Sequence, residues 1–129
     1  MWLSSLTAGQ RSTLLRLAHN VVVSDGLLDP NEELMLDEFK REMALKPDAD
    51  ANYIELHGIE RIFDSPRSRT IALLNLLKLS YVDGAFEIEE ECFLKELSRA
   101  FGVDNAEFLL LDNWVRRLVS LEREARGFM

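Results

Sequence analysis

Two short stretches of the chain carry carboxylates at a spacing that suits a cation-binding bend. Within each stretch, three acids follow one another at intervals of four residues. Such crowded carboxylates repel each other unless a cation or a basic partner neutralises them. Hard divalent cations such as Ca²⁺ and Mg²⁺ prefer oxygen ligands of this kind, and Mn²⁺ and Zn²⁺ also bind carboxylates. The candidate metal ligands are Asp25, Asp29 and Glu33 in the first stretch, and Asp83, Glu87, Glu90 and Glu91 in the second.

Helix capping is the alternative explanation for these acids. An Asp-Gly pair between helices is a common helix-ending turn, because glycine tolerates a positive φ and aspartate caps through its side chain. Acids in the first turn of a helix also lie near the positive end of the helix dipole. The spacing does not fit an EF-hand, since Gly26 directly follows Asp25 and Glu33 comes only eight positions after Asp25. A cation site here, whether each stretch has its own or the two stretches share one, would therefore be of another type.

The charge of the protein is concentrated in these stretches. The chain has 129 residues, 23 acids, 15 bases and a net charge of −8. Residues 25–38 and 83–96 together hold 12 of those acids and only one base, Lys95. The acidic balance excludes a general nucleic-acid binder, which needs a basic surface.

The two acidic stretches are copies of each other. A shift of 58 residues aligns 25–45 with 83–103 without a gap and gives seven identities in 21 positions. Apolar positions upstream also match, so we place the repeats at about 13–45 and 71–103. Two copies are too few for a solenoid, and a pseudo-twofold pair of helical hairpins sharing one core is the better interpretation.

The elements that must position these acids are all helical. Capping boxes, N-terminal prolines and helix-ending glycines mark the boundaries, and no stretch has the period-two alternation of a strand. Residues 48–64 fit one helix or two short ones interrupted near Gly58. The expected helices run from Thr7 to Ser24, Pro30 to Lys46, Pro66 to Tyr81, about Ile88 to Gly102, and Asp104 to about Gly127. We therefore expect one all-α domain over residues 1–129, a bundle of about six to seven helices.

The repeated pattern resembles the tellurite-resistance TerB-like family. The matching residues are Asp25-Gly26 followed by Glu33, and Asp83-Gly84 followed by Glu91. The resemblance covers roughly residues 8–122. It implies an all-helical pseudo-symmetric fold, metal chelation by the acids after each Asp-Gly, and association with bacterial stress-response or membrane-linked complexes. Carried over by position, the implied ligands are Asp25, Glu33, Asp83, Glu90 and Glu91. The residues before each Asp-Gly depart from the small ones common in the family.

The other potentially reactive side chains, two histidines and one cysteine, do not indicate a catalytic site. His19 could support a cation site, but it and His57 fit better as structural histidines. Cys92 is expected on the core-facing side of its helix, as an inert thiol together with Phe93, Leu97 and Phe101. No phosphate-binding loop, nucleophile motif or paired metal-binding histidine motif is present, so we expect no enzyme.

The last helix offers a second binding surface. Arg116 and Arg123 lie seven residues apart on one of its faces. A solvated face paired with nearby glutamates is one interpretation, and contact with an acidic protein partner or an anionic membrane surface is the other. With a single cysteine and no long apolar run, the chain is expected to be cytoplasmic, without a transmembrane segment. The two hypotheses are a domain that binds a cation or protein partner at its acidic bends, and an adaptor that binds through this helix.

Overall fold

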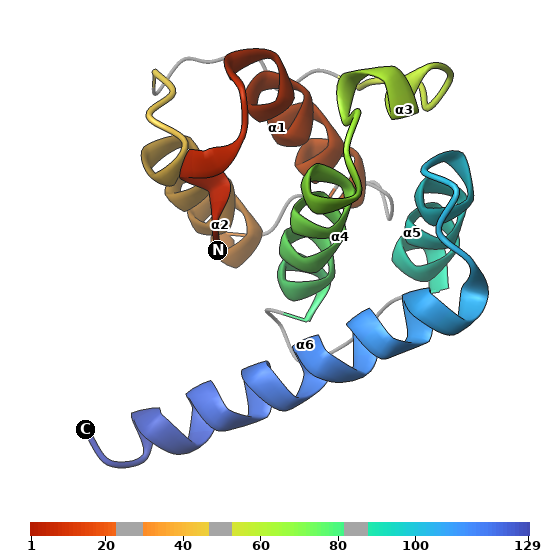
Figure 1. The fold of residues 1–129 in the computed structure, drawn as a ribbon. Coiled ribbons are helices and arrows are strands. Elements are labelled where there is room, and N and C mark those ends of the chain that lie inside the picture. Colours follow the sequence, from red (N-terminus) through yellow and green to blue (C-terminus); the bar gives the residue numbers. More distant parts are fainter. Residues whose placement is uncertain (23–29, 47–52, 82–87) are drawn as a thin grey trace.

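The computed structural model of the chain describes residues 1–22, 30–46, 53–81 and 88–129, excluding the side chains of residues 31, 32, 88 and 89. All regular elements in these residues are helices, which confirms the expected all-α fold (Figure 1). They are the short 3₁₀ helix η1 (Leu3–Ser5) and the α-helices α1 (Ala8–Val22), α2 (Pro30–Glu42), α3 (Ile59–Ile62), α4 (Pro66–Ser80), α5 (Ile88–Ala100) and α6 (Asn105–Arg126).

Local capping starts three of these helices where the sequence predicted. Before α1, the Thr7 backbone N–H donates to Gln10 Oε1 at 3.0 Å, and the Gln10 N–H donates to Thr7 Oγ1 at 3.1 Å. Ser65 caps α4 in the same way, with a proline at the first helical position. Asp104 caps α6 by accepting the Glu107 N–H at 2.8 Å.

The helix boundaries recur at the offset found in the sequence. Ala8 and Pro66, where α1 and α4 begin, are 58 positions apart, and both helices have 15 residues. Pro30 and Ile88, where α2 and α5 begin, have the same separation, and both helices have 13 residues. The helix α1 packs on α4 at the centre, α2 packs on α1, and α5 packs on α4 and α1 (Figure 1). The two acidic stretches thus lead into equivalent helices.

One arginine in each hairpin connects its two helices, and the two arginines occupy equivalent positions. Arg11 in α1 donates to the carbonyl of Met43, just after α2, at 3.3 Å, and Arg69 in α4 donates to the carbonyl of Phe101, just after α5, at 3.2 Å. Each guanidinium also donates two hydrogen bonds to the segment before its own helix. The carbonyls in these additional bonds belong to Leu6 and Ser4 for Arg11, and to Phe63 and Glu60 for Arg69. Each arginine therefore fixes where the second helix of its hairpin ends.

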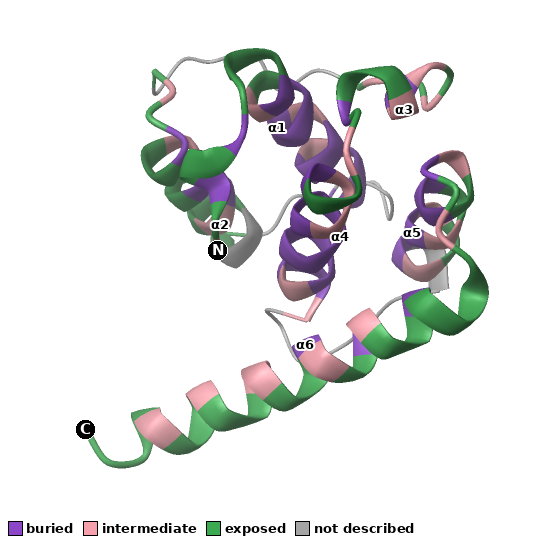
Figure 2. Ribbon diagram, in the orientation of Figure 1, coloured by how far each residue is buried: buried purple, intermediate pink, exposed green. Residues whose placement is uncertain are grey.

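The hydrophobic core lies between the central pair of helices and the elements packed around it. Figure 2 shows that α1 and α4 are buried over much of their length, whereas α6 is buried on one side only. Phe108, Asp112 and Val115 form the buried side of α6, which packs on α4 and α5. The C-terminal half of α6 extends beyond these helices toward the C-terminus (Figure 1).

Three sequence expectations are wrong. Cys92 is exposed rather than core-facing. The buried side of α5 carries Glu90, Leu94 and Leu97, and at about 100° per residue Cys92 lies nearly opposite their midline. In the middle segment, residues 53–58 are not helical, and the only helix in the described part of that segment is α3, which follows Gly58 at a φ of 79°. Residues 47–52 lie outside the described residues. In addition, α2 ends at Glu42, a few residues before the expected Lys46.

The described residues contain no helix whose length and apolar character would allow it to cross a lipid bilayer.

Candidate functional site at the acidic bends

The structure describes three of the seven predicted metal ligands. Glu33 is exposed in α2, while Glu90 and Glu91 lie in the first turns of α5. Glu33 and Glu91 are equivalent, because each is the fourth residue of its helix. Among the described side chains no group of three or more His, Cys, Asp or Glu is arranged to hold a metal ion. The other predicted ligands, Asp25, Asp29, Asp83 and Glu87, lie outside the described residues, so a complete site would need them.

The two described acids of the second bend differ in their surroundings. Glu90 is only 8% exposed and lies on the buried side of α5. Glu91 is partly exposed and forms an ion pair with Lys95, one turn later, at 3.1 Å. An exposed pair of this type stabilises a helix by only about 0.3–0.5 kcal/mol, so a cation could displace Lys95 at little cost. Glu91 is therefore the more available ligand.

A polar cluster of buried Asp112, half-buried Tyr81 and exposed Arg116 lies at the end of α4, directly before the second acidic stretch in the sequence. The Tyr81 hydroxyl donates to Asp112 Oδ1 at 2.6 Å. Arg116 Nε donates to the Tyr81 hydroxyl oxygen at 2.8 Å and lies 3.1 Å from Asp112 Oδ2. The Arg116 guanidinium also stacks over the Tyr81 ring, 5.6 Å from its centroid. These contacts fasten the C-terminal end of α4 to α6.

Two pKa values in this cluster are raised, those of Tyr81 and Arg116. Burial of the Tyr81 phenol, followed by its hydrogen bond to Asp112, raises the pKa of Tyr81 to about 12. The hydrogen bond to Tyr81 and the charge of Asp112 raise the pKa of Arg116, and the charge of Glu91 contributes in the same direction. Glu91 is the smallest of these causes, and the main ones are the contacts of Arg116 with Tyr81 and Asp112.

The sequence reasoning missed this cluster, although one signal pointed to it. Asp112 sits between Phe108 and Val115 on the apolar side of α6, and all three are buried. A carboxylate on such a face is rarely buried unless it is paired. The Tyr81 partner lies 31 residues away in the sequence, so the pairing itself could not be read locally.

The two arginines predicted to bind a partner have different roles in the structure. Arg116 makes the contacts to Tyr81 and Asp112 and is tied to the body of the protein. Arg123 is exposed and lines a cavity of about 230 Å³ between α2 and the C-terminal half of α6. Glu38, Tyr81 and Glu122 are among the other residues that line this cavity.

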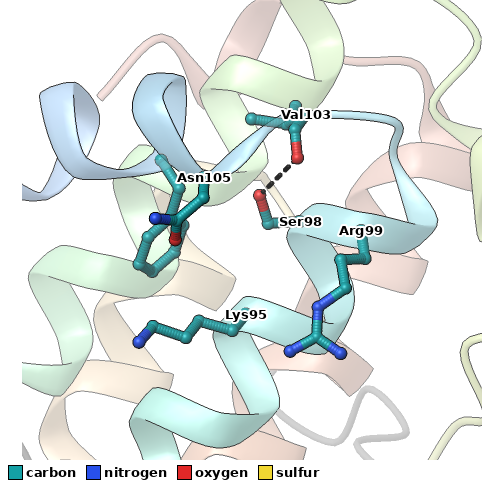
Figure 3. Close-up of a pocket in the computed structure, with 6 residues that line it drawn as sticks. Lys95, Ser98, Arg99, Val103 and Asn105 are labelled. Carbon is teal, nitrogen blue, oxygen red and sulfur yellow. Dashed lines mark hydrogen bonds between the residues drawn. The ribbon is translucent and has the colours of Figure 1, made fainter.

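A small cavity of about 50 Å³ lies where α5 meets α6 (Figure 3). Lys95 and Arg99 of α5 line it together with Asn105 at the start of α6. The Ser98 hydroxyl donates to the Val103 carbonyl at 3.2 Å at the edge of this cavity. Lys95 also pairs with Glu91, so it partly neutralises the negative charge of the second acidic stretch.

The two histidines differ in their exposure. His57 is exposed. The Nδ1 atom of His19 is buried, and it has no hydrogen-bond partner among the described residues.

Comparisons with protein-family models, with curated proteins and with solved structures gave no significant match. The structure itself defines the class of protein as an all-α domain of two equivalent helical hairpins and a long final helix. The TerB-like resemblance stays a prediction from the sequence.

Proposed function

We propose that this protein is a non-enzymatic binding domain whose two acidic bends take up a divalent cation, a protein partner, or both. The proposed cation ligands are Asp25, Asp29 and Glu33 in the first bend, and Asp83, Glu87, Glu90 and Glu91 in the second. Following the TerB-like resemblance, the proposed setting is a bacterial stress-response or membrane-linked complex.

The observation that carries this proposal is the equivalence of the two hairpins. Both acidic stretches enter a 13-residue helix, and each of these helices packs on a central 15-residue helix. Capping requires one acid at each helix start, whereas each bend has at least three. A repeated excess of carboxylates at equivalent positions is what two related cation sites require.

The Tyr81 cluster suggests how a bound cation would act on the rest of the molecule. Tyr81 ends the helix before the second bend and is fastened to Asp112 and Arg116 of α6. A cation that draws the carboxylates of this bend together would change the position of Glu91 relative to Arg116. Occupancy at the bend would in this way alter the surface that α6 presents.

Thermal unfolding of the metal-stripped protein, with and without millimolar Ca²⁺, Mg²⁺, Mn²⁺ or Zn²⁺, tests the proposal. A cation that binds only the native state at about one hundred times its Kd stabilises it by about 2.7 kcal/mol, so the midpoint must rise by several degrees. The combined substitution Asp25→Asn with Asp83→Asn should abolish that rise.

The chain offers a matched control for this experiment. Glu38 and Glu96 are also repeat-related acids, and both are exposed further along α2 and α5. Glu38→Gln with Glu96→Gln removes the same charge and should leave the cation-dependent rise intact. If no cation shifts the wild-type midpoint, or if the two double variants respond alike, the cation proposal is wrong.

The second candidate function is an adaptor that binds through α6. The observation that favours it is Arg123, exposed beside a cavity of about 230 Å³ that it shares with Arg126. In this alternative the acids only cap the helices, and Arg116 and Arg123 contact an acidic partner. Arg116→Glu with Arg123→Glu should then eliminate partner recovery in a pull-down, whereas the Asp25→Asn with Asp83→Asn variant should recover the partner normally.

A further inference from the structure

The helix α6 has a second apolar face, on which Trp114 packs partly on the rest of the protein and the residues that follow it are exposed. Leu110 is 70% exposed, Leu121 is 61% exposed and Phe128 is 90% exposed, while Trp114 is partly buried. Trp114 and Leu121 lie seven residues apart in α6, and at about 100° per residue they are well separated from the buried row; Phe128, two residues after the end of α6, continues the interval of seven. A helix that packs on one side only needs one apolar face, so the second face is available for a partner.

This face continues onto the body of the protein. The Trp2 ring lies against that of Trp114, with centroids 6.3 Å apart and an interplanar angle of 40°. Trp2 also borders a groove of about 390 Å³ that is lined in part by Ile71 and Leu74 of α4. Trp2 therefore connects Trp114 to this groove, and we call the row Trp114, Leu121 and Phe128 the outer face.

Two charged residues beside the apolar row indicate which partner the outer face binds. Arg117 and Glu124 are both exposed, lie seven residues apart beside the apolar row, and form no ion pair within the part of the chain that the structure describes. In an antiparallel pair of α6 helices centred near Leu121, Arg117 of each copy approaches Glu124 of the other. In a parallel pair these residues of the two copies lie on opposite sides of the interface, so Arg117 and Glu124 would not meet.

The same antiparallel register matches the apolar residues. Leu121 then packs on Leu121 of the second copy at the twofold axis, and Trp114 lies opposite Phe128 of that copy. We propose that the outer face of α6 pairs antiparallel with the outer face of a second copy of this chain. The interface includes none of the described candidate ligands Glu33, Glu90 and Glu91, nor the side of α6 that carries Arg116 and Arg123, so its test is separate from that of the proposed cation site.

The dimer is expected to be weak. Pairing over the last few turns of α6 involves fewer than the roughly 20–30 residues a side that are typical of stable complexes. We therefore expect dissociation constants on the order of tens of micromolar, a range that sedimentation equilibrium can follow.

A charge-swap series tests the partner and its orientation together. Arg117→Glu and Glu124→Arg should each weaken dimerisation by about tenfold or more, because each places like charges opposite one another across the interface. The double variant should restore the wild-type constant to within about threefold, because it rebuilds both pairs with their signs reversed. Arg123→Glu, an equal charge change on another side of α6, is the matched control and should leave dimerisation unchanged.

Site-directed cross-linking tests the register. In a Cys92→Ser background, which removes the one native thiol, Leu121→Cys should form an intermolecular disulfide under mild oxidation, because the twofold axis brings the two thiols together. Leu110→Cys should not cross-link in the antiparallel register. Cross-linking of both variants would indicate a parallel pair and overturn the assigned orientation.

The proposal fails on either of two further results. One is a wild-type protein that stays monomeric up to near-millimolar concentration. The other is a dimer that Leu121→Arg leaves intact while circular dichroism shows the variant to be folded. A monomer whose outer face binds anionic lipid vesicles, with binding lost in Leu121→Arg, would assign this face to a membrane instead and would likewise overturn the proposal.

Discussion

At the scale of single residues, two arginines have a larger structural role than their surroundings in the sequence indicate. Arg11 and Arg69 each donate to three backbone carbonyls, and these carbonyls belong to two segments distant from each other in the chain. A planar guanidinium can serve several carbonyls at once, which the single ammonium of lysine cannot do in the same geometry. The hairpins are thus held together at their ends by polar contacts in addition to the core.

Removing one of these arginines should destabilise the protein. Arg69→Ala leaves three carbonyls without their charged donor, and we expect a loss of about 2–4 kcal/mol in the free energy of unfolding measured by urea denaturation. Arg69→Lys should recover less than half of that loss. Arg67→Ala, two positions away on the exposed surface, should change the stability by less than about 0.5 kcal/mol. Equal effects at the two positions would contradict the role assigned to Arg69.

Tyr81 gives a prediction about pH. Its pKa is raised from 10.0 to about 12 in the folded protein, so the folded state holds the phenolic proton more tightly than the unfolded state does. This contribution to stability is fully present below pH 10 and is lost as the pH rises toward 12. Ultraviolet titration of the folded protein should show a tyrosine ionising near pH 12, and Tyr81→Phe should remove that step. A Tyr81 that ionises near pH 10 in the folded protein would show that its hydroxyl is not held by Asp112.

At the scale of elements, the two equivalent helices α2 and α5 end in the same way with different residues. Ala44 after α2 has a φ of 57°, and Gly102 after α5 has a φ of 74°. In both turns the following N–H bonds back to a helix carbonyl, from Leu45 to Lys40 at 2.8 Å and from Val103 to Ser98 at 2.9 Å. This left-handed ending favours glycine, because a Cβ is strained there.

Exchanging these residues should change stability in opposite directions. Ala44→Gly should stabilise the protein by about 1 kcal/mol, because it removes the strain of a left-handed alanine. Gly102→Ala should destabilise it by a similar amount, although the space around Gly102 is open to an added Cβ. Chemical denaturation of both variants measures the two changes. If both substitutions change the free energy of unfolding in the same direction, backbone conformation does not determine the effect of a substitution at these turns.

The elements also show which features can be predicted from sequence. The starts of α1, α4 and α6 were predictable because capping involves residues only three positions apart. The inward side of α5 was not, since Cys92, Phe93 and Leu94 are adjacent apolar residues and only packing on α1 and α4 selects among them. The end of α2 was also missed, because alanine gives no signal for the left-handed turn at Ala44.

At the scale of the whole molecule, the proposed function depends on two equivalent pairs of helices, each of which is joined in the sequence by an acidic stretch. The repeat was visible in the sequence because both acid spacing and identities survive a shift of 58 residues. The fastening of the second bend to α6 was not, since Tyr81, Asp112 and Arg116 meet only through tertiary packing. The first repeat has Val23 at the position equivalent to Tyr81, so the two bends are expected to respond differently to a bound cation.

The most direct test of the central claim is to locate a bound cation by paramagnetic broadening. In amide-resolved NMR spectra of the metal-stripped protein, substoichiometric Mn²⁺ should broaden the signals of Glu33 and Glu91 first, because both lie in the first turns of their helices. The signals of Arg41 and Arg99, at the opposite ends of α2 and α5, should broaden last. Uniform broadening, or broadening centred on any surface other than the two bends, would contradict cation binding at this site.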